Sequence, residues 1–346
     1  MAEALVLERP RVLSLRDIDL PCAMGPDDVR IRMEVVGICG SDIHYYRHGR
    51  IGPFVVEAPM VLGHEGAGTV IAAGGRVRHL KPGDRVCIEP GIPDFSSRAS
   101  RIGLYNLDPA LTFWATPPVH GCLTPEVVHP ASLCYRLPEA VSQAEGAMVE
   151  PLAVGLQAVH KAGVAAGDVA LVLGAGPIGI LVALSALAGG CARVLIYDPA
   201  AAKMAVATRY AGIEAVTAAP GDIAGFVQAA TAGWGVDLVF ECSGAAPAYD
   251  VAAPCLRPGG TLVCVGMASA PVALDIVALI VREIRIVTVF RYANVYDRAI
   301  ALMAGGRIDV KPLISATYDF ADSIAAFGRA DAAHPDDVKI QIRLPG

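Results

Sequence analysis

The sequence predicts an α/β protein with two domains, one a compact β-rich domain and the other a doubly wound parallel sheet. The chain has 346 residues, 54% of them hydrophobic, which is more than a single core usually organises. From Val169 to Val265, short apolar runs alternate with Ala- and Leu-rich stretches, the pattern of parallel strands joined by helices. Roughly the first 150 residues instead combine short strands with turns that contain glycine or proline.

The predicted domain boundaries follow from where each pattern begins and ends. After Arg285 the chain is expected to return to the β-rich domain, which therefore comprises residues 1–153 and 286–346. The sheet domain comprises residues 154–285. The runs and turns that carry the β-rich prediction are Val29 to Val35, Gly66 to Ile71 and Lys81 to Val86.

The sheet domain is built from apolar runs that are short enough to be buried parallel strands. A helix is expected from Ile178 to Ala188, packed over the first of them. The segment from Val169 to Ala192 has no charged residue and is long enough to cross a membrane. Glycines and Pro177 interrupt it near its start, which favours a buried strand, turn and helix. The predicted strands are Val169 to Leu173, Val194 to Tyr197, Val236 to Phe240 and Thr261 to Val265.

The turn after the first strand has the glycine fingerprint of a dinucleotide site. Gly174-Ala175-Gly176-Pro177-Ile178-Gly179 follows the strand and opens the helix, the context that makes a G-x-G-x-x-G string informative. Asp198 ends the second strand about twenty residues further on, where an acid accepts hydrogen bonds from ribose hydroxyls and repels a 2′-phosphate. This predicts a Rossmann domain that prefers NAD to NADP. In the alternative interpretation, Asp198 only caps the next helix, and nearby Lys203 weakens the charge argument.

Four residues of the β-rich domain provide the ligand types of a catalytic zinc with one open position. They are Cys39, His64, Glu65 and Glu150. An alcohol is about as weak an acid as water, with a pKa of about 15.7, so forming its alkoxide at pH 7 costs roughly 12 kcal/mol. A general base alone supplies only about 10²–10⁴-fold in rate, so a Lewis acid is needed. Metal and nicotinamide together predict alcohol oxidation.

Which carboxylate completes the metal site is open at the level of the residues. Glu65 directly follows His64, and consecutive side chains of a strand point to opposite faces. Both can bind one metal only if the backbone between Gly63 and Gly66 is irregular. Glu150 therefore competes, as a ligand or as a residue that holds the metal's water.

Composition and charge exclude several classes of partner. The net charge is −6 without clusters of Lys or Arg, which argues against nucleic acid and anionic membranes and favours a small neutral substrate. The nine cysteines include no C-x-x-C pair, so a disulfide framework is not expected and the compartment should be reducing. The first ten residues have no secretory signal pattern, so the cytoplasm is the expected location.

Several strings resemble one enzyme family. Val36 to Tyr45 and Pro59 to Glu65 resemble the zinc-dependent medium-chain dehydrogenases, and the likeness runs from about Glu34 to about Phe327. The resemblance implies a GroES-like catalytic domain with a Rossmann domain, and an NAD-dependent polyol dehydrogenase of the sorbitol dehydrogenase or D-xylulose reductase type. It also suggests a homotetramer. The strings that resemble the polyol branch are Tyr105 to Leu107, Phe113 to Pro118, Val149 to Leu152 and Val289 to Tyr292.

The family resemblance also implies roles for single residues. Cys39, His64 and Glu65 would bind zinc, and Glu150 would contact the zinc water and the substrate. Ser41 and His44 match a proton relay to solvent, and Asp42 an acid that orients the zinc histidine. The ordinary alternatives are a Ser-Asp turn and a surface histidine. Along the cofactor the family places Gly174, Gly176, Pro177, Ile178, Gly179, Asp198, Lys203, Val265, Gly266, Met267, Val289, Phe290 and Arg291, and around the polyol Tyr45, Phe113, Glu150, Arg291 and Tyr292.

One segment departs from the family pattern. Many relatives carry four cysteines for a structural zinc in the lobe that corresponds to Gly91 to Pro109, and this chain has none there. One catalytic zinc and no structural zinc are therefore expected. The alternatives in function are other zinc-dependent dehydrogenases of this family, of the L-threonine, butanediol or aldonate type. A zinc-free quinone reductase or a non-enzymatic nucleotide-binding protein would have no use for the metal ligands.

Overall fold

The structure, a computed structural model, describes residues 2–345 and divides into two compact units. The first unit comprises Met1–Glu150 and Tyr296–Gly346, and the second comprises Pro151–Val295. The second unit thus continues ten residues beyond the predicted boundary after residue 285. Part of this extension is strand β18 (Arg285–Thr288), which pairs with β17 (Leu256–Cys264) as a further strand of the parallel sheet.

The first unit is built around a seven-stranded sheet that is mostly antiparallel. Its central strand, β3 (Asp28–Gly37), alternates buried and half-buried side chains, so Val29, Ile31 and Met33 face the core. Along the sheet the strands run β12 (Cys134–Arg136), β8 (Arg85–Ile88), β7 (Glu65–Ala73), β3 (Asp28–Gly37), β20 (Lys339–Arg343) and β19 (Ile314–Asp319), with β11 (Glu126–Pro130) also paired to β3.

Smaller elements complete this unit. A second sheet contains β2 (Val12–Ile18), β1 (Ala2–Arg9) and β6 (Met60–Val61), and the paired short strands are β4 (Arg50–Ile51) with β5 (Phe54–Val55) and β9 (Gly91–Ile92) with β10 (Thr112–Phe113). The helices are α1 (Gly40–His48), α2 (Arg98–Arg101), α3 (Gln143–Gly146), α10 (Tyr296–Ala304) and α11 (Ser323–Ala332).

The C-terminal strand lies beside the segment that follows β3. Strand β20 pairs with the end of β3 in antiparallel register, with Gln341 opposite Gly37. The Ile38 amide donates to the Ile340 carbonyl at 2.9 Å, so the pairing extends past the end of β3. On its other side, Gly37 is opposite Glu65 of β7. Three segments distant in sequence therefore meet at this end of the sheet.

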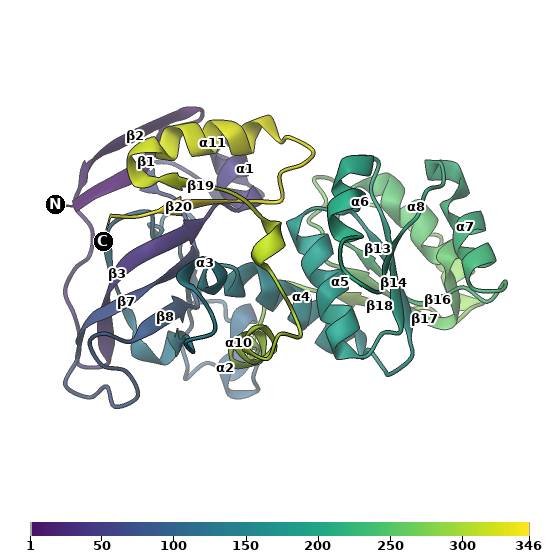
Figure 1. Cartoon of the computed structure of the whole chain (residues 1–346), viewed down its shortest axis with the longest axis horizontal. Coiled ribbons are helices and arrows are strands. Elements are labelled where there is room, and N and C mark those ends of the chain that lie inside the picture. The colour runs from purple at the N-terminus through teal and green to yellow at the C-terminus, as the bar shows by residue number, and fades with distance from the viewer. Residues whose placement is uncertain (1, 346) are drawn as a thin grey trace. The chain divides into compact units, whose positions relative to one another are not determined.

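The second unit contains a six-stranded parallel sheet in the order β15-β14-β13-β16-β17-β18. Numbered along the chain, this is the strand order 3-2-1-4-5-6 of a dinucleotide-binding fold. Helices α5 and α6 lie on one face, and α7 and α8 on the other (Figure 1). In chain order, the other helices and strands here are α4 (Val149–Ala162), β13 (Val169–Leu173), α5 (Pro177–Gly189), β14 (Arg193–Tyr197), α6 (Ala201–Ala207), β15 (Ile213–Ala215), α7 (Ile223–Ala230), β16 (Val236–Glu241), α8 (Ala246–Cys255) and α9 (Ile276–Ile280).

The apolar segment that could have been a membrane span is a strand, a turn and a helix. Strand β13 and helix α5 divide it, and α5 is only 13 residues long. None of the helices within residues 2–345 is both long enough and apolar enough to span a bilayer.

Candidate metal centre and dinucleotide site

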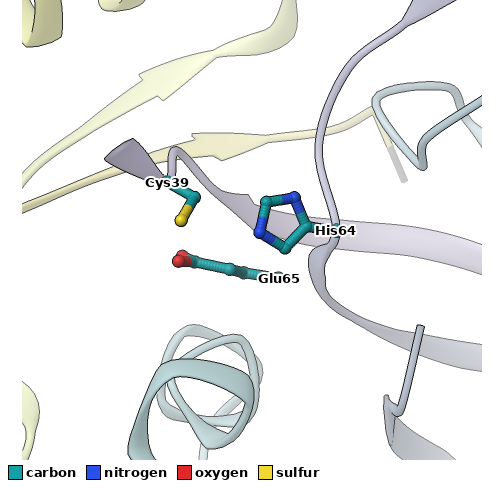
Figure 2. Close-up of side chains that lie close together, drawn as sticks. All are labelled: Cys39, His64 and Glu65. Atoms are coloured by element: carbon teal, nitrogen blue, oxygen red, sulfur yellow. The ribbon is translucent and has the colours of Figure 1, made fainter. Parts of the chain in front are cut away.

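Three predicted ligands come together at one end of the antiparallel sheet. The ligand atoms of Cys39, His64 and Glu65 all lie within 4.8 Å of one another. Figure 2 shows the Cys39 thiol and the Glu65 carboxylate near each other, with the His64 ring beside them. His64 and Glu65 are buried, and Cys39 is partly exposed. One thiol, one imidazole and one carboxylate are the three protein ligands of a site that keeps a fourth position open.

The local backbone explains how adjacent residues can share this cluster. His64 precedes β7, which begins at Glu65, and Gly63 has φ +88°. A left-handed residue here interrupts the alternation of side chains along the strand. This is the irregular backbone that His64 and Glu65 need in order to bind one metal. A Cβ at Gly37 would lie 2.1 Å from Glu65 Oε2, so the opposite strand leaves room for the carboxylate.

Asp42 links the two ligand-bearing loops. Its Oδ2 accepts from the Cys39 amide and its Oδ1 from the Gly63 amide, both at 3.0 Å. Asp42 Oδ1 also lies 3.7 Å from His64 Nδ1, on the side predicted for an acid that orients the imidazole. Burial disfavours the imidazolium, but Asp42 and Cys39 raise the pKa of His64 well above its ordinary value.

The buried polar groups of the cluster fit a cation. His64 is buried, and its Nδ1 lies on the Asp42 side, 3.7 Å from Oδ1, so the other ring nitrogen is the one left for the cluster. Glu65 is completely buried, as is Asp42 beside it. A divalent cation balances this accumulation of negative charge and of thiol and imidazole donors, and sulfur with nitrogen favours zinc over magnesium or calcium.

Glu150, the competing carboxylate, lies outside this group of three. It is buried in the first turn of α4. Among residues 2–345, the cluster of ligand atoms comprises Cys39, His64 and Glu65 only. The structure therefore favours Glu65 as the third ligand, and the role of Glu150 near the metal stays a prediction.

Lys339 is a member of the site that sequence reasoning missed. Its Nζ donates to both Glu65 oxygens, at 2.6 and 2.7 Å, and to the Ile38 carbonyl at 3.1 Å. Only 3% of the lysine is exposed. The one signal in the sequence is a lysine at the start of an otherwise apolar strand, which does not say what it contacts.

Glu89 is a second buried charged residue, after Lys339, that could not be identified from the sequence. The hydroxyls of Tyr105 and Tyr135 donate to its two oxygens at 2.7 and 2.8 Å. Burial raises its pKa to about 7 in spite of these two donors. The hydrogen bond to Glu89 holds the Tyr105 side chain in place. In the sequence, Tyr105 stands out only as part of a segment that resembles the polyol branch.

Helix α1 carries the predicted relay and one predicted substrate residue. Ser41 and His44 are three residues apart on this helix and therefore share a face. His44 is exposed, and partial burial together with the charges of His48 and Arg47 lowers its pKa. Tyr45 is buried on the same helix. Phe113 is also buried, with its ring 5.7 Å from the His64 ring.

Hydrogen bonds from side chains to the backbone stabilise the lobe from Gly91 to Pro109. Asp108 Oδ2 accepts from the Asp94 amide at 2.6 Å, and Asp94 Oδ1 accepts from the Ser96 amide at 2.8 Å. The Ser97 hydroxyl caps α2 by accepting from the Ser100 amide at 3.1 Å. Short polar side chains thus supply contacts within the lobe.

In the second unit the glycine fingerprint has the geometry of a phosphate-binding turn. Gly174 has φ +103°, and a Cβ at Gly179 would lie 1.8 Å from the Gly174 carbonyl oxygen. A Cβ at Gly176 would meet no atom within 4 Å. The space beside Gly176, at the N-terminus of α5, is therefore left for a group that the chain does not supply, as a pyrophosphate requires.

Asp198 contacts both the fingerprint turn and the turn that precedes α6. Its Oδ2 accepts from the Ala175 amide and its Oδ1 from the Ala200 amide, both at 2.9 Å. The N-cap of α6 is Ala200, which has no side-chain cap, so Asp198 does not cap that helix, and its contact with a ribose stays a prediction. Lys203 lies close by on α6 and is partly exposed.

The other predicted cofactor residues follow the carboxyl ends of parallel strands, where ligands bind in such sheets. Val265, Gly266 and Met267 come after β17, and Val289 and Phe290 after β18. Met267 is 72% and Phe290 41% exposed, which is unusual for large apolar side chains and leaves surface for a ligand.

The predicted polyol residues belong to different units. Tyr45, Phe113 and Glu150 are in the first, and Arg291 and Tyr292 are in the second. The Arg291 guanidinium lies over the Phe290 ring, 4.9 Å from its centre, and Tyr292 is buried. Their joint contact with a polyol stays a prediction.

Two family models match most of the chain. The alcohol dehydrogenase GroES-like domain matches residues 25–139, and the zinc-binding dehydrogenase model matches residues 177–305. Each match falls mainly within one of the two predicted domains.

Curated relatives match over nearly their whole length. A protein of Rhizobium meliloti (strain 1021), provisionally named D-xylulose reductase, is 61% identical, with 100% of each chain covered. D-xylulose reductase of Morganella morganii is 53% identical, covering 95% of this chain and 97% of its own. Rat (Rattus norvegicus) sorbitol dehydrogenase is 43% identical, covering 94% and 92%.

Solved structures share the whole architecture. An Escherichia coli oxidoreductase of unknown specificity superposes with a TM-score of 0.94 at 36% identity, with 100% of both chains covered. A Sinorhizobium meliloti 1021 protein, provisionally described as a zinc-binding dehydrogenase and solved bound to NADP, has a TM-score of 0.88 at 29% identity, with 99% of each chain covered.

Proposed function

The chain belongs to the zinc-dependent medium-chain dehydrogenases, in the branch of the polyol dehydrogenases, and on that premise we propose that it oxidises a secondary hydroxyl of a pentitol or hexitol to a ketose with NAD. The observation that carries this proposal is the cluster of Cys39, His64 and Glu65 in a chain that also has the fingerprint turn at Gly174 to Gly179. The relatives named for D-xylulose and sorbitol support the substrate class.

We assign one zinc per chain to Cys39, His64 and Glu65, with a fourth position open to water or substrate. Zinc at this position would supply a Lewis acid that lowers the pKa of an alcohol and polarises the product carbonyl. Asp42 orients the His64 ring, and Phe113 packs against that ring and helps to exclude bulk water.

The shared face of α1 supports a path for the alcohol proton. Ser41 can accept the proton and His44, which is exposed, can pass it to solvent. The lowered pKa of His44 keeps its imidazole neutral near pH 7, as an acceptor must be. Glu150 and Tyr45 are the polar side chains that we assign to the substrate in this unit.

The carboxylate of Asp198 should set the preference for NAD. Asp198→Ala is expected to raise the ratio of kcat/KM for NADP to that for NAD by about tenfold, because a negative charge facing a 2′-phosphate is lost, worth ~1.4 kcal/mol. Steady-state kinetics with both cofactors measure the ratio.

A second variant separates this charge effect from structural damage. Asp198 also holds the Ala175 and Ala200 amides, so its loss should weaken both cofactors equally through the turn. Asp198→Asn keeps an acceptor oxygen without the charge and should shift the ratio in the same direction. An unchanged ratio in both variants would leave Asp198 only its structural contacts with the Ala175 and Ala200 amides.

Kinetics on a panel of alcohols test the substrate class. Xylitol and sorbitol should exceed ethanol and butanol in kcat/KM by at least about 100-fold, since each buried polar group left unpaired by a small alcohol costs about 1–3 kcal/mol. Arg291→Ala should selectively lower kcat/KM for polyols. Simple alcohols matching xylitol would refute the polyol assignment, and unchanged polyol kinetics would remove Arg291 from the substrate site.

The remaining assignments concern assembly and location. We propose a homotetramer in the cytoplasm that binds small molecules and neither nucleic acid nor membrane. Apolar side chains on the second unit support self-association, since Val277 and Ile280 of α9 are 69% and 66% exposed and Ile286 of edge strand β18 is 39% exposed.

A further inference from the structure

We propose that Lys339 is a positioning residue that competes with the metal for Glu65, holding the site together without metal and making bound zinc easier to exchange. This inference rests on the zinc site proposed above. Lys339 touches neither Cys39 nor His64 by any hydrogen bond that the structure shows, and acts through the third ligand alone.

The contact is close, complete and buried. The Lys339 ammonium reaches both oxygens of Glu65, at 2.6 and 2.7 Å, and takes the Ile38 carbonyl as its third acceptor at 3.1 Å. Its three N–H donors are therefore all used. The side chains of Lys339 and Glu65 are 3% and 1% exposed, so water cannot replace either partner. A metal that takes Glu65 must share the carboxylate with this cation.

The fold holds the ammonium in this place. Lys339 begins β20, which pairs with the end of β3, and the Ile38 amide donates to the Ile340 carbonyl beside it. Without metal and without Lys339, Glu65 would be a buried carboxylate with no counter-charge, which is strongly destabilising. Lys339 thus keeps the metal-free site formed.

The sign of the effect on zinc differs from that of Asp42. An acid beside a ligating histidine raises the basicity of the ligand and strengthens the metal bond. A cation on both oxygens of a ligating carboxylate withdraws electron density and repels the metal. Loss of Asp42 should therefore weaken zinc binding, and loss of Lys339 should tighten it.

The experiment measures zinc affinity by competition with a chromophoric chelator, on enzymes purified with zinc. Lys339→Met, of similar length and uncharged, should bind zinc about tenfold more tightly than the wild type and lose it more slowly, the lower end of the range for residues that contact a ligand. Asp42→Asn should bind zinc at least about tenfold more weakly.

Two further variants separate charge from folding. Lys339→Arg keeps a cation that can hold both carboxylate oxygens and should restore an affinity near that of the wild type. Arg16→Met removes a more exposed ion pair of the same unit, in which Arg16 contacts both Glu8 oxygens at 2.5 and 3.1 Å, and should leave zinc affinity unchanged. Should Lys339→Met not fold, Lys339→Gln, a neutral donor, replaces it with the same expected direction.

The outcomes distinguish this inference from the site on which it rests. Tighter zinc in Lys339→Met with recovery in Lys339→Arg supports it. Equal or weaker binding in Lys339→Met, while the wild type holds zinc through Cys39, overturns the role of Lys339 alone. A wild type that binds no zinc overturns the metal site itself.

Discussion

Cys39→Ala should abolish polyol oxidation and leave NAD binding intact. The thiol is the one sulfur ligand in the cluster, and an alanine leaves two ligands where a catalytic zinc uses three. Loss of a Lewis acid that supplies several kcal/mol should lower kcat by at least about 10³-fold. NADH formation measures turnover, and fluorescence titration measures NADH binding, which depends on the glycine turn of the other unit.

A buried cysteine outside the cluster provides the matched control. Cys134→Ala in β12 removes a thiol from the same unit and should keep both zinc and activity, apart from a small loss of stability. His64→Ala should behave like Cys39→Ala. Near-normal activity in either of those two variants would show that the zinc mechanism is wrong.

Gly179→Ala should have the reciprocal effect, with loss of NADH binding and retention of zinc. The new Cβ would lie 1.8 Å from the Gly174 carbonyl oxygen, so helix α5 and the fingerprint turn must separate. Overpacking costs about 1–3 kcal/mol, and a contact of 1.8 Å with backbone places this variant at the upper end. If the bound state bears that cost, NADH affinity falls by about 100-fold. NADH titration and zinc analysis of the same preparation check both halves.

Another helical glycine of the same unit provides the control. A Cβ at Gly225 on α7 meets no atom within 4 Å, so Gly225→Ala should bind NADH normally and be slightly more stable. Normal NADH affinity in Gly179→Ala would contradict the close packing assigned to the third glycine of the fingerprint.

The sequence predicts much of the parallel sheet because its signals are local. Strand β13 has the predicted bounds, and α5 differs from its prediction by one residue at each end. After β13 come the glycine turn, helix α5, strand β14 and then Asp198. This is the fixed order of the first half of a Rossmann domain. The compact unit extends ten residues past the predicted boundary, in part because β18 gains its identity by pairing with β17 and not from its own short sequence.

The metal cluster could be predicted in part. Cys39 and the pair His64-Glu65 stand in recognisable strings, and the glycine before His64 allows the irregular backbone that both ligands need. Lys339 could not be predicted, because 274 residues separate it from Glu65. Their contact depends on β20 joining the edge of β3, a long-range pairing for which one sequence carries no periodic signal.

A zinc titration of the metal-depleted enzyme tests the central claim most directly. Zinc is removed from the wild type with a chelator and added back in steps while xylitol oxidation with NAD is measured. The account predicts no activity without zinc and a linear recovery that ends at one zinc per chain. Xylitol oxidation that persists without zinc, or recovery that ends only at two zincs per chain, would contradict it.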